Sequence, residues 1–228
     1  MELQGLKIDA ISDTHNRHNH FTMPGGDILI HAGDATMGGR VSEVMGFLDW
    51  FAKQPYAHKI FVPGNHDWLF EENPTLCAEE CKNRGIVLLN DSGIEIEGIK
   101  IWGSPVQPEF CDWAFNRNDV EIVDHWDLIP ADTEILITHG PAYERLDFIP
   151  QQNKSVGCPH LFNKIMQTKI KLNIFGHIHE SRGYTYKDGK VWVNAAVLDG
   201  MYRPTSGNPR RIVKCADGEY YVENESES

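Results

Sequence analysis

Five short groups of residues combine Asp, Asn and His, the side chains whose oxygen and nitrogen atoms bind divalent metal ions. In chain order they are Asp13-Thr14-His15, Gly33-Asp34, Gly64-Asn65-His66-Asp67, Thr138-His139-Gly140 and Gly176-His177-Ile178-His179. The first group is a weak signal on its own because such triplets occur by chance, and the second is weaker still, since Asp34 could equally be a turn residue or a helix N-cap. The third and fifth groups are more specific. Brought together, these donors, which include no thiolate, would suit Mn²⁺, Fe²⁺/Fe³⁺, Zn²⁺ or Co²⁺.

Individual side chains in these groups suit different tasks at a site with two metal ions. The carboxylate of Asp34 has two oxygens, so it can bridge two cations. The side-chain carbonyl of Asn65 can bind a metal, and the adjacent His66 would then lie within reach of a bound substrate. His177 and His179 stand at alternate positions, so their two imidazoles can serve two neighbouring metals.

Each polar group follows a run of apolar residues that predicts a buried β-strand. The runs are short and rich in Ile, Val, Leu and Phe. They cover residues 8–12, 28–33, 59–64, 134–138 and 172–176. Ligands of open α/β sheets gather at the carboxyl ends of strands. All five runs place their polar group at that end, so the sequence predicts that the five groups meet in one site.

Helices and hairpins are expected between and after these runs. Residues 41–54, 74–84, 119–126 and 159–168 have the spacing or the end signals of helices, and Gly85 is expected to cap the second one. Hairpins are expected around Glu97-Gly98, Asp188-Gly189 and Asp217-Gly218. No linker interrupts the chain, so residues 1–228 are predicted to form one mixed α/β domain in which helices cover sheets.

The ordered set D-x-H, G-D, G-N-H-D, H-G and G-H-x-H resembles the calcineurin-like metallophosphoesterases. Residues 12–17, 27–34, 138–141, 156–158 and 175–180 resemble more closely the small metallophosphoesterase-domain proteins of the fetal-brain type, which act as phosphodiesterases. This resemblance implies a four-layer α/β/β/α sandwich of two mixed sheets. It also implies a metal-dependent hydrolase in which a hydroxide between two metal ions attacks phosphorus in line.

The same resemblance implies the roles of single residues. The implied metal ligands are Asp13, His15 and His179 for the first ion, Asn65, His139 and His177 for the second, and Asp34 between the two. His66 is implied as a catalytic residue over the substrate, where it would protonate the leaving alkoxide or stabilise its charge. Mn²⁺ is the favoured metal, with Fe, Zn or Co as alternatives.

One position departs from the pattern of the superfamily. Some of its phosphatases carry an aspartate three residues after the bridging one, and this aspartate supports the acid histidine. Here that residue is Met37. Asp67 could support His66 instead, although neighbouring side chains often point apart. Arg17, on the loop after the first group, could contact a substrate phosphate, and a solvated surface position is an equally simple interpretation.

Charge and composition narrow the choice of substrate and compartment. The net charge of −12 repels polyphosphate backbones, so a small phosphoester is a better expected partner than a long nucleic acid. No stretch approaches the ~18 apolar residues of a membrane span, so no membrane partner is expected. The odd number of five cysteines, without the spacing of a zinc ribbon, favours reduced thiols and a cytoplasmic location. The sequence indicates no oligomeric state.

The substrate wall and the type of phosphoester remain open. Trp113, Phe115 and residues 148–158 could line the substrate site, and core packing or an ordinary loop is the simpler interpretation. A phosphodiesterase for small, nucleotide-like diesters is the favoured function. The alternatives are a phosphomonoesterase or protein phosphatase, and a scaffold that kept the fold but lost catalysis, as the retromer subunit of this superfamily did. The complete ligand set and the presence of His66 disfavour the scaffold.

Overall fold

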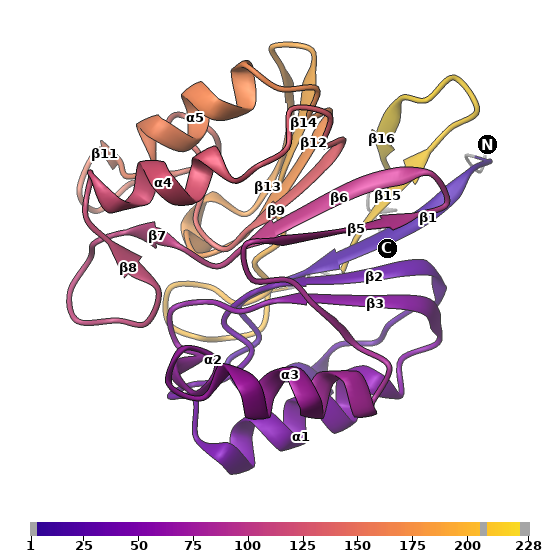
Figure 1. Ribbon diagram of the computed structural model, residues 1–228, viewed down its shortest axis with the longest axis vertical. Coiled ribbons are helices and arrows are strands. Elements are labelled where there is room, and N and C mark those ends of the chain that lie inside the picture. The colour runs from indigo at the N-terminus through magenta and orange to yellow at the C-terminus, as the bar shows by residue number, and fades with distance from the viewer. Residues whose placement is uncertain (1–3, 206–208, 224–228) are drawn as a thin grey trace.

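The computed structural model describes residues 4–205 and 209–223 and contains two six-stranded sheets (Figure 1). The order of the first sheet is β16 (Tyr220–Val222), β15 (Arg210–Lys214), β1 (Leu6–Ile11), β2 (Gly26–Ala32), β3 (Tyr56–Val62) and β4 (Val87–Leu88). The order of the second sheet is β13 (Gly183–Lys187), β14 (Lys190–Asn194), β12 (Leu172–Phe175), β9 (Ile135–Thr138), β6 (Ile99–Ser104) and β5 (Ser92–Ile96).

Both sheets are mixed, with a parallel centre and antiparallel edges. Strands β1 to β4 run parallel to one another, as do β6, β9, β12 and β14. Strands β5, β13, β15 and β16 pair in antiparallel fashion. Beyond the ends of β1 and β14, Ser12 pairs with Ala196 in a parallel bridge. The two sheets are therefore joined at the edge where their parallel strands end.

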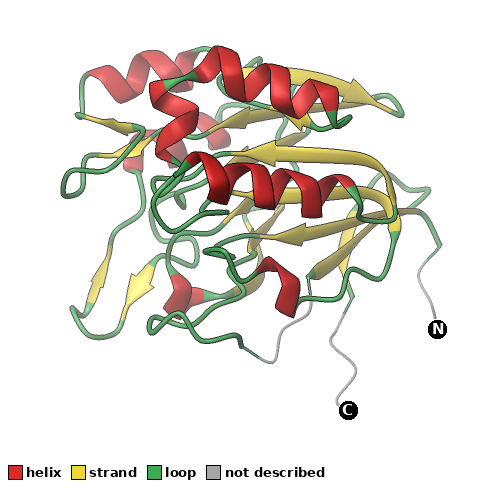
Figure 2. Cartoon of the chain, turned by 90° about the horizontal axis from the view of Figure 1, so that it is seen from below, coloured by secondary structure: helices red, strands yellow, loops and turns green. Residues whose placement is uncertain are grey.

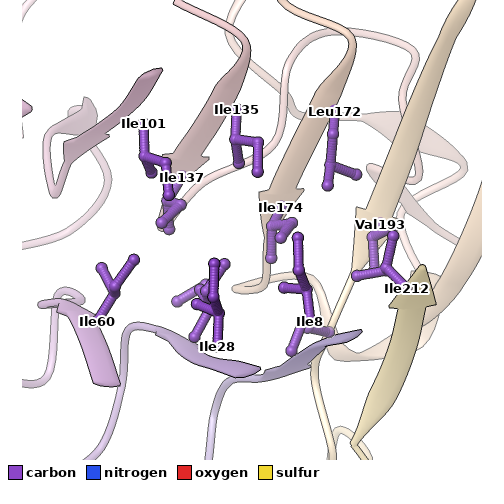
Figure 3. Close-up of a cluster of buried hydrophobic side chains, with 14 of the residues drawn as sticks. Ile8, Ile28, Ile60, Ile101, Ile135, Ile137, Leu172, Ile174, Val193 and Ile212 are labelled. Carbon is purple, nitrogen blue, oxygen red and sulfur yellow. The ribbon is translucent and has the colours of Figure 1, made fainter. Parts of the chain in front are cut away.

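The inner faces of the two sheets bury one apolar core between them (Figure 3). Ile8 and Ile28 of the first sheet point toward Ile137 and Ile174 of the second, and all four side chains are fully buried. Burial of one such side chain contributes roughly 1.5–3 kcal/mol of transfer free energy. The runs of β-branched residues that predict the strands therefore also hold the sheets together.

Helices cover the two outer faces (Figures 1 and 2). Helix α1 (Val41–Ala52) and helix α3 (Pro74–Asn83) pack on the first sheet, where the rings of Phe47 and Phe61 lie 4.9 Å apart. Helix α4 (Glu121–Asp127) and helix α5 (Pro159–Met166) pack on the second sheet, where Trp126 and Ile165 meet Trp192. The predicted four-layer α/β/β/α sandwich is confirmed.

Most of the predicted elements are confirmed. The five apolar runs form β1, β2, β3, β9 and β12, and the three predicted hairpins are β5–β6, β13–β14 and β15–β16. The sequence did not reveal helix α2 (Trp68–Glu72), the 3₁₀ turns η1 (His18–His20) and η2 (His179–Ser181), or the short pairs β7 (Gln107–Pro108) with β8 (Asn116–Arg117) and β10 (Phe148–Ile149) with β11 (Lys154–Ser155).

The single domain over residues 1–228 stays a prediction, because residues 1–3, 206–208 and 224–228 lie outside the described residues. Within 4–205 and 209–223, no helix is long and apolar enough to cross a membrane.

Candidate metal centre

The candidate ligands stand where the chain leaves the parallel strands and turns sharply. Asp13, His15, Asp34 and His177 have positive φ angles of 56°, 40°, 55° and 67°. Residues other than glycine rarely adopt this left-handed backbone conformation, and such backbone strain is concentrated at functional sites. Backbone hydrogen bonds hold the turns against each other, since Asp13 N donates to Gly33 O at 2.9 Å and His15 N donates to Asp34 O at 3.0 Å.

Glycines allow the ligand loops to approach closely. A Cβ on Gly33 would overlap the ring of His139, one on Gly64 would overlap the Asp34 carboxylate, and one on Gly176 would overlap the Asp13 carboxylate. These glycines precede three of the candidate ligands in the sequence. Their role is therefore steric, because only a residue without a side chain leaves room for a ligand from another strand.

The first set of donors is Asp13, His15 and His179, whose ligand atoms all lie within 4.8 Å of one another. His179 Nε2 is 3.3 Å from Asp13 Oδ1. The Asp13 carboxylate is fully buried and also accepts a hydrogen bond from His177 N. His15 Nε2 is buried without a hydrogen-bond partner. An orphaned imidazole nitrogen beside two carboxylates is the arrangement that a cation would satisfy.

The second set of donors is Asp34, His139 and His177, and its ligand atoms lie equally close together. His139 Nε2 is 3.4 Å from Asp34 Oδ2 and 3.0 Å from Asn65 Oδ1. Asp34 Oδ2 also lies 3.7 Å from His15 Nε2, which belongs to the first set. Asp34 therefore stands between the two sets, as the resemblance implies. The structure brings all seven predicted ligands together.

Backbone carbonyls orient three of the imidazoles. His15 Nδ1 donates to Thr36 O at 3.2 Å, and His139 Nδ1 donates to Ala32 O at 2.9 Å. His179 Nδ1 donates to Asp199 O at 2.9 Å. Because a carbonyl only accepts, Nδ1 carries the proton in each ring, and Nε2 is the atom directed at the carboxylates. These hydrogen bonds could not be predicted from the sequence, because every residue has a backbone carbonyl group and residue type does not show which one accepts.

Two of the candidate ligand histidines have raised pKa values. Burial lowers the pKa of His139 and His179, but the neighbouring carboxylates of Asp34 and Asp13 raise it more, to about 9 in each case. Two imidazolium groups therefore balance two carboxylates at neutral pH when no metal ion is bound. A cation that binds here has to displace these protons.

A family model described as calcineurin-like phosphoesterase matches residues 6–181, which contain all five polar groups. The chain belongs to the calcineurin-like phosphoesterase family. Members of this family use divalent metal ions, in agreement with the two donor sets.

Comparisons that cover most of the chain agree with this assignment. The human and mouse proteins named metallophosphoesterase domain-containing protein 1 are each 36% identical over 227 residues, covering 90% of this chain and 69% of theirs. A UPF0046 protein of Caenorhabditis elegans is 32% identical over 204 residues, covering 84% of this chain and 69% of its own.

Two solved structures share the fold at low sequence identity. Phosphopantetheinyl hydrolase of Mycobacterium tuberculosis is 16% identical with a TM-score of 0.62, covering 96% of this chain and 99% of its own. The protein TT1561 of Thermus thermophilus is 12% identical with a TM-score of 0.63, covering 97% and 99% of the two chains.

In this member of the calcineurin-like phosphoesterase family, His66 is held by Met37, the residue that stands where some related phosphatases carry an aspartate. His66 Nδ1 donates to the backbone carbonyl of Met37 at 2.8 Å, and His66 N donates to Asp34 Oδ1 at 2.8 Å. His66 Nε2 lies 4.0 Å from Asp34 Oδ2. Distance alone would also allow His66 to bind a metal, since His15, Asp34 and His66 form a third group of close donors. The role of His66 as a catalytic acid, and not as a metal ligand, therefore stays a prediction.

Asp67 has a different task from the one considered for it. Its carboxylate accepts hydrogen bonds from Ala35 N, from Thr36 N and Oγ1, and from Gly64 N, at 2.7–3.2 Å. Burial and the nearby Asp34 charge raise the pKa of Asp67 to about 6. Asp67 thus ties the loop of Asp34 to the loop of Asn65, while Met37 orients His66 through its carbonyl.

A cavity of about 700 Å³ opens over the donor sets. Its lining includes Trp113 and part of the 148–158 segment. Phe115, by contrast, is 2% exposed and belongs to the core. Of the two aromatic residues considered for the substrate wall, Trp113 therefore lines the cavity and Phe115 does not. Arg17 is exposed and is not among the lining residues, so its contact with a substrate stays a prediction. Sequence reasoning missed other lining residues, among them Phe110, Tyr143 and Tyr202.

Proposed function

We propose that the protein is a binuclear, metal-dependent phosphodiesterase for small, nucleotide-like diesters. The observation that carries this proposal is the convergence of six candidate metal ligands around a seventh, Asp34, below a cavity that His66 also lines. The expected substrate is a small molecule, because the net charge of −12 opposes the approach of a long polyanion.

The side chains fit two metal ions. Asp13, His15 and His179 would hold one ion, Asn65, His139 and His177 the other, and Asp34 both. The unpartnered Nε2 of buried His15 and the mixed oxygen and imidazole donors support this fit. We favour Mn²⁺ on the chemistry of the donors. When bound, the ions would polarise the phosphoryl oxygens and lower the pKa of water.

His66 is placed to manage the proton of the leaving group. The hydrogen bond from Nδ1 to the Met37 carbonyl leaves Nε2 as the ring atom that can exchange a proton, and the residue lines the cavity. In its protonated form, Nε2 would donate its proton to the leaving alkoxide oxygen as the P–O bond breaks.

The aromatic lining of the cavity favours a diester over a phosphate monoester. Phe110, Trp113, Tyr143 and Tyr202 all contribute to its lining, so a second substituent on phosphorus would meet aromatic surface. Aromatic rings stack on bases at about 1–3 kcal/mol each, which suits a nucleoside-like substituent. We also propose a cytoplasmic location, because the buried Cys77 and Cys81 on α3 are free thiols.

Hydrolysis assays with defined metals test this proposal. The Mn²⁺-loaded protein should hydrolyse bis(p-nitrophenyl) phosphate, and excess EDTA should abolish the reaction. Full activity in EDTA would exclude the metal mechanism. A panel of diesters and monoesters under the same conditions separates a diesterase from a monoesterase, and activity on neither class would favour the scaffold.

His66→Ala tests the acid separately from the metals. This variant should hydrolyse diesters more slowly, by roughly 10²–10⁴-fold where the leaving group needs a proton. Its metal content, measured by plasma mass spectrometry, should stay near that of the wild type. Loss of metal from the variant would instead assign His66 as a ligand.

A further inference from the structure

We infer that Trp113 is a positioning residue that fixes the ring of His66, and that the loop of residues 109–115 holds Trp113 in place. The inference rests on the catalytic role proposed above for His66. It assigns part of the substrate wall a second task, which is to align the group that gives up the proton.

The contact between the two rings is close. The indole of Trp113 and the imidazole of His66 have centroids 4.1 Å apart and planes inclined by 32°. The ring of His15 meets the same imidazole edge-on, with centroids 4.7 Å apart. The hydrogen bond to Met37 O fixes only one atom of the His66 ring. The indole covers a face of that ring beside the cavity and therefore limits its rotation.

Hydrogen bonds tie the 109–115 loop to the chain that carries His66. Ala114 N donates to Asn65 O at 3.3 Å, beside His66 itself. Phe115 N donates to Glu71 Oε2 at 2.9 Å, and Arg117 Nη1 donates to Glu71 Oε1 at 3.0 Å. Glu71 lies on α2, the helix that follows the Asn65-His66-Asp67 turn. Trp113 and His66 therefore belong to one hydrogen-bonded unit.

A second chain of contacts anchors this unit to the second sheet. Arg117 Nε donates to His125 Nε2 at 3.2 Å, so the other nitrogen, Nδ1, carries the proton and donates to Asp91 Oδ2 at 2.6 Å. Asp91 also accepts a hydrogen bond from Ser104 Oγ, at the end of β6, at 2.6 Å. The loop is thus fixed on the side of α2 and on the side of α4.

A matched residue on the same loop separates positioning from ordinary wall contact. Phe110 also lines the cavity, but its ring contacts His177, at 6.0 Å between centroids, and not His66. A change at Phe110 should act on the substrate site without acting through His66, whereas a change at Trp113 should act through His66.

The kinetic test compares two diesters of similar shape. The leaving group of bis(p-nitrophenyl) phosphate departs without a proton, while that of diphenyl phosphate is more basic and depends on the acid. Trp113→Ala should lower kcat for diphenyl phosphate by about tenfold more than for the nitrophenyl ester, and Trp113→Phe should recover most of this loss. In a His66→Ala background this difference between the two esters should disappear, because Trp113→Ala then removes only the wall contact. Phe110→Ala should have the same effect in both backgrounds.

A second readout does not depend on activity. In metal-free protein, the ring protons of His66 should show a ring-current shift in NMR spectra, and Trp113→Ala should remove it while Phe110→Ala keeps it. Equal losses from Trp113→Ala with and without His66, or an unchanged His66 resonance, would overturn the positioning role alone. A wild-type protein that hydrolyses neither ester would overturn the proposed function, and the NMR comparison would then decide whether Trp113 fixes His66.

Discussion

The floor and the wall of the cavity are built in different ways. The floor consists of side chains at the ends of parallel strands, and its central members, such as Asp13 and His139, have no exposed surface. The wall includes the 109–115 loop and the β10–β11 arm (residues 148–155), together with Tyr143 and Tyr202. Side-chain contacts hold both segments, for example the hydrogen bond from Ser181 Oγ to Phe148 O at 2.7 Å.

This difference indicates how each region responds to change. The floor is set by two packed sheets, by glycines that leave room for ligands, and by buried charges that need each other. A small change there disturbs several groups at once. The wall is partly exposed, so its residues can change with smaller effects on the fold. We therefore expect the floor to determine whether the chemistry occurs and the wall to determine which ester is used.

The largest effect is expected from Asp34→Asn, because both donor sets share this carboxylate. The change removes the charge that the proposed ions share and leaves the His139 imidazolium without its partner. Loss of residues that merely support a ligand costs about 10–100-fold in metal affinity or activity, so this change should exceed that range. Metal content and diesterase rate measure the effect.

An exposed aspartate provides the control for Asp34→Asn. Asp119→Asn also removes one negative charge from the chain, but it lies on the surface and does not line the cavity. It should keep wild-type metal content and rate. Two bound ions and near-normal activity in Asp34→Asn would show that the two sets do not depend on a shared carboxylate.

The second effect concerns the packing of the floor. Gly176→Ala would place a Cβ against the Asp13 carboxylate and Ser12, so the loops of β1 and β12 would have to separate. We expect loss of metal and a free energy of unfolding reduced by about 1–3 kcal/mol, as for other overpacked sites. Gly46→Ala is the control, because a Cβ at this position in α1 meets no atom within 4 Å.

The two glycine variants should move stability in opposite directions. Gly46→Ala should raise the free energy of unfolding by about 0.5–1 kcal/mol, since alanine is the better helix residue. Urea denaturation of the metal-free proteins measures both values. Equal stability and full metal binding in Gly176→Ala would contradict the steric role of this glycine.

Strand ends explain why the floor could be predicted from the sequence and the wall could not. His139 directly follows a buried strand, and Asp13 and Asp34 each follow one after a single intervening residue, so position in the chain fixes position in the fold. Trp113 and Phe115 are only two residues apart, yet one lines the cavity and the other is in the core. The positive φ of 60° at Phe115 and its long-range hydrogen bond to Glu71 decide this, and neither is visible in residue type.

The histidines of the floor predict how the stability of the metal-free protein depends on pH. His139 and His179 have folded-state pKa values of about 9, above the ordinary 6.5, so the stability they contribute is lost as the pH rises from 6.5 to 9. Burial lowers the pKa of His15 and His177 to about 4, so stability also falls as the pH drops from 6.5 to 4. The metal-free protein should be most stable near pH 6.5.

Urea denaturation in the presence of a chelator measures this profile. The slope on the alkaline side should reach up to about 1.4 kcal/mol per pH unit for each histidine. Metal-loaded protein should lack this alkaline loss, because bound ions replace the two protons. A metal-free profile that is flat between pH 6.5 and 9 would contradict the pairing of these histidines with Asp13 and Asp34.

The smallest effect is expected in the wall, from Lys154→Ala. Lys154 is an exposed residue of β11 that lines the cavity, so its charge attracts an anionic diester without taking part in the floor. An exposed ionic contact is worth about 0.2–1 kcal/mol, so KM should rise about two- to fivefold with kcat unchanged. Lys169→Ala is the matched control, because Lys169 is exposed and lies outside the lining of the cavity. This change should leave KM and kcat at wild-type values. Salt should weaken wild-type binding more than binding by Lys154→Ala. A fall in kcat without a change in KM would instead place Lys154 with the floor.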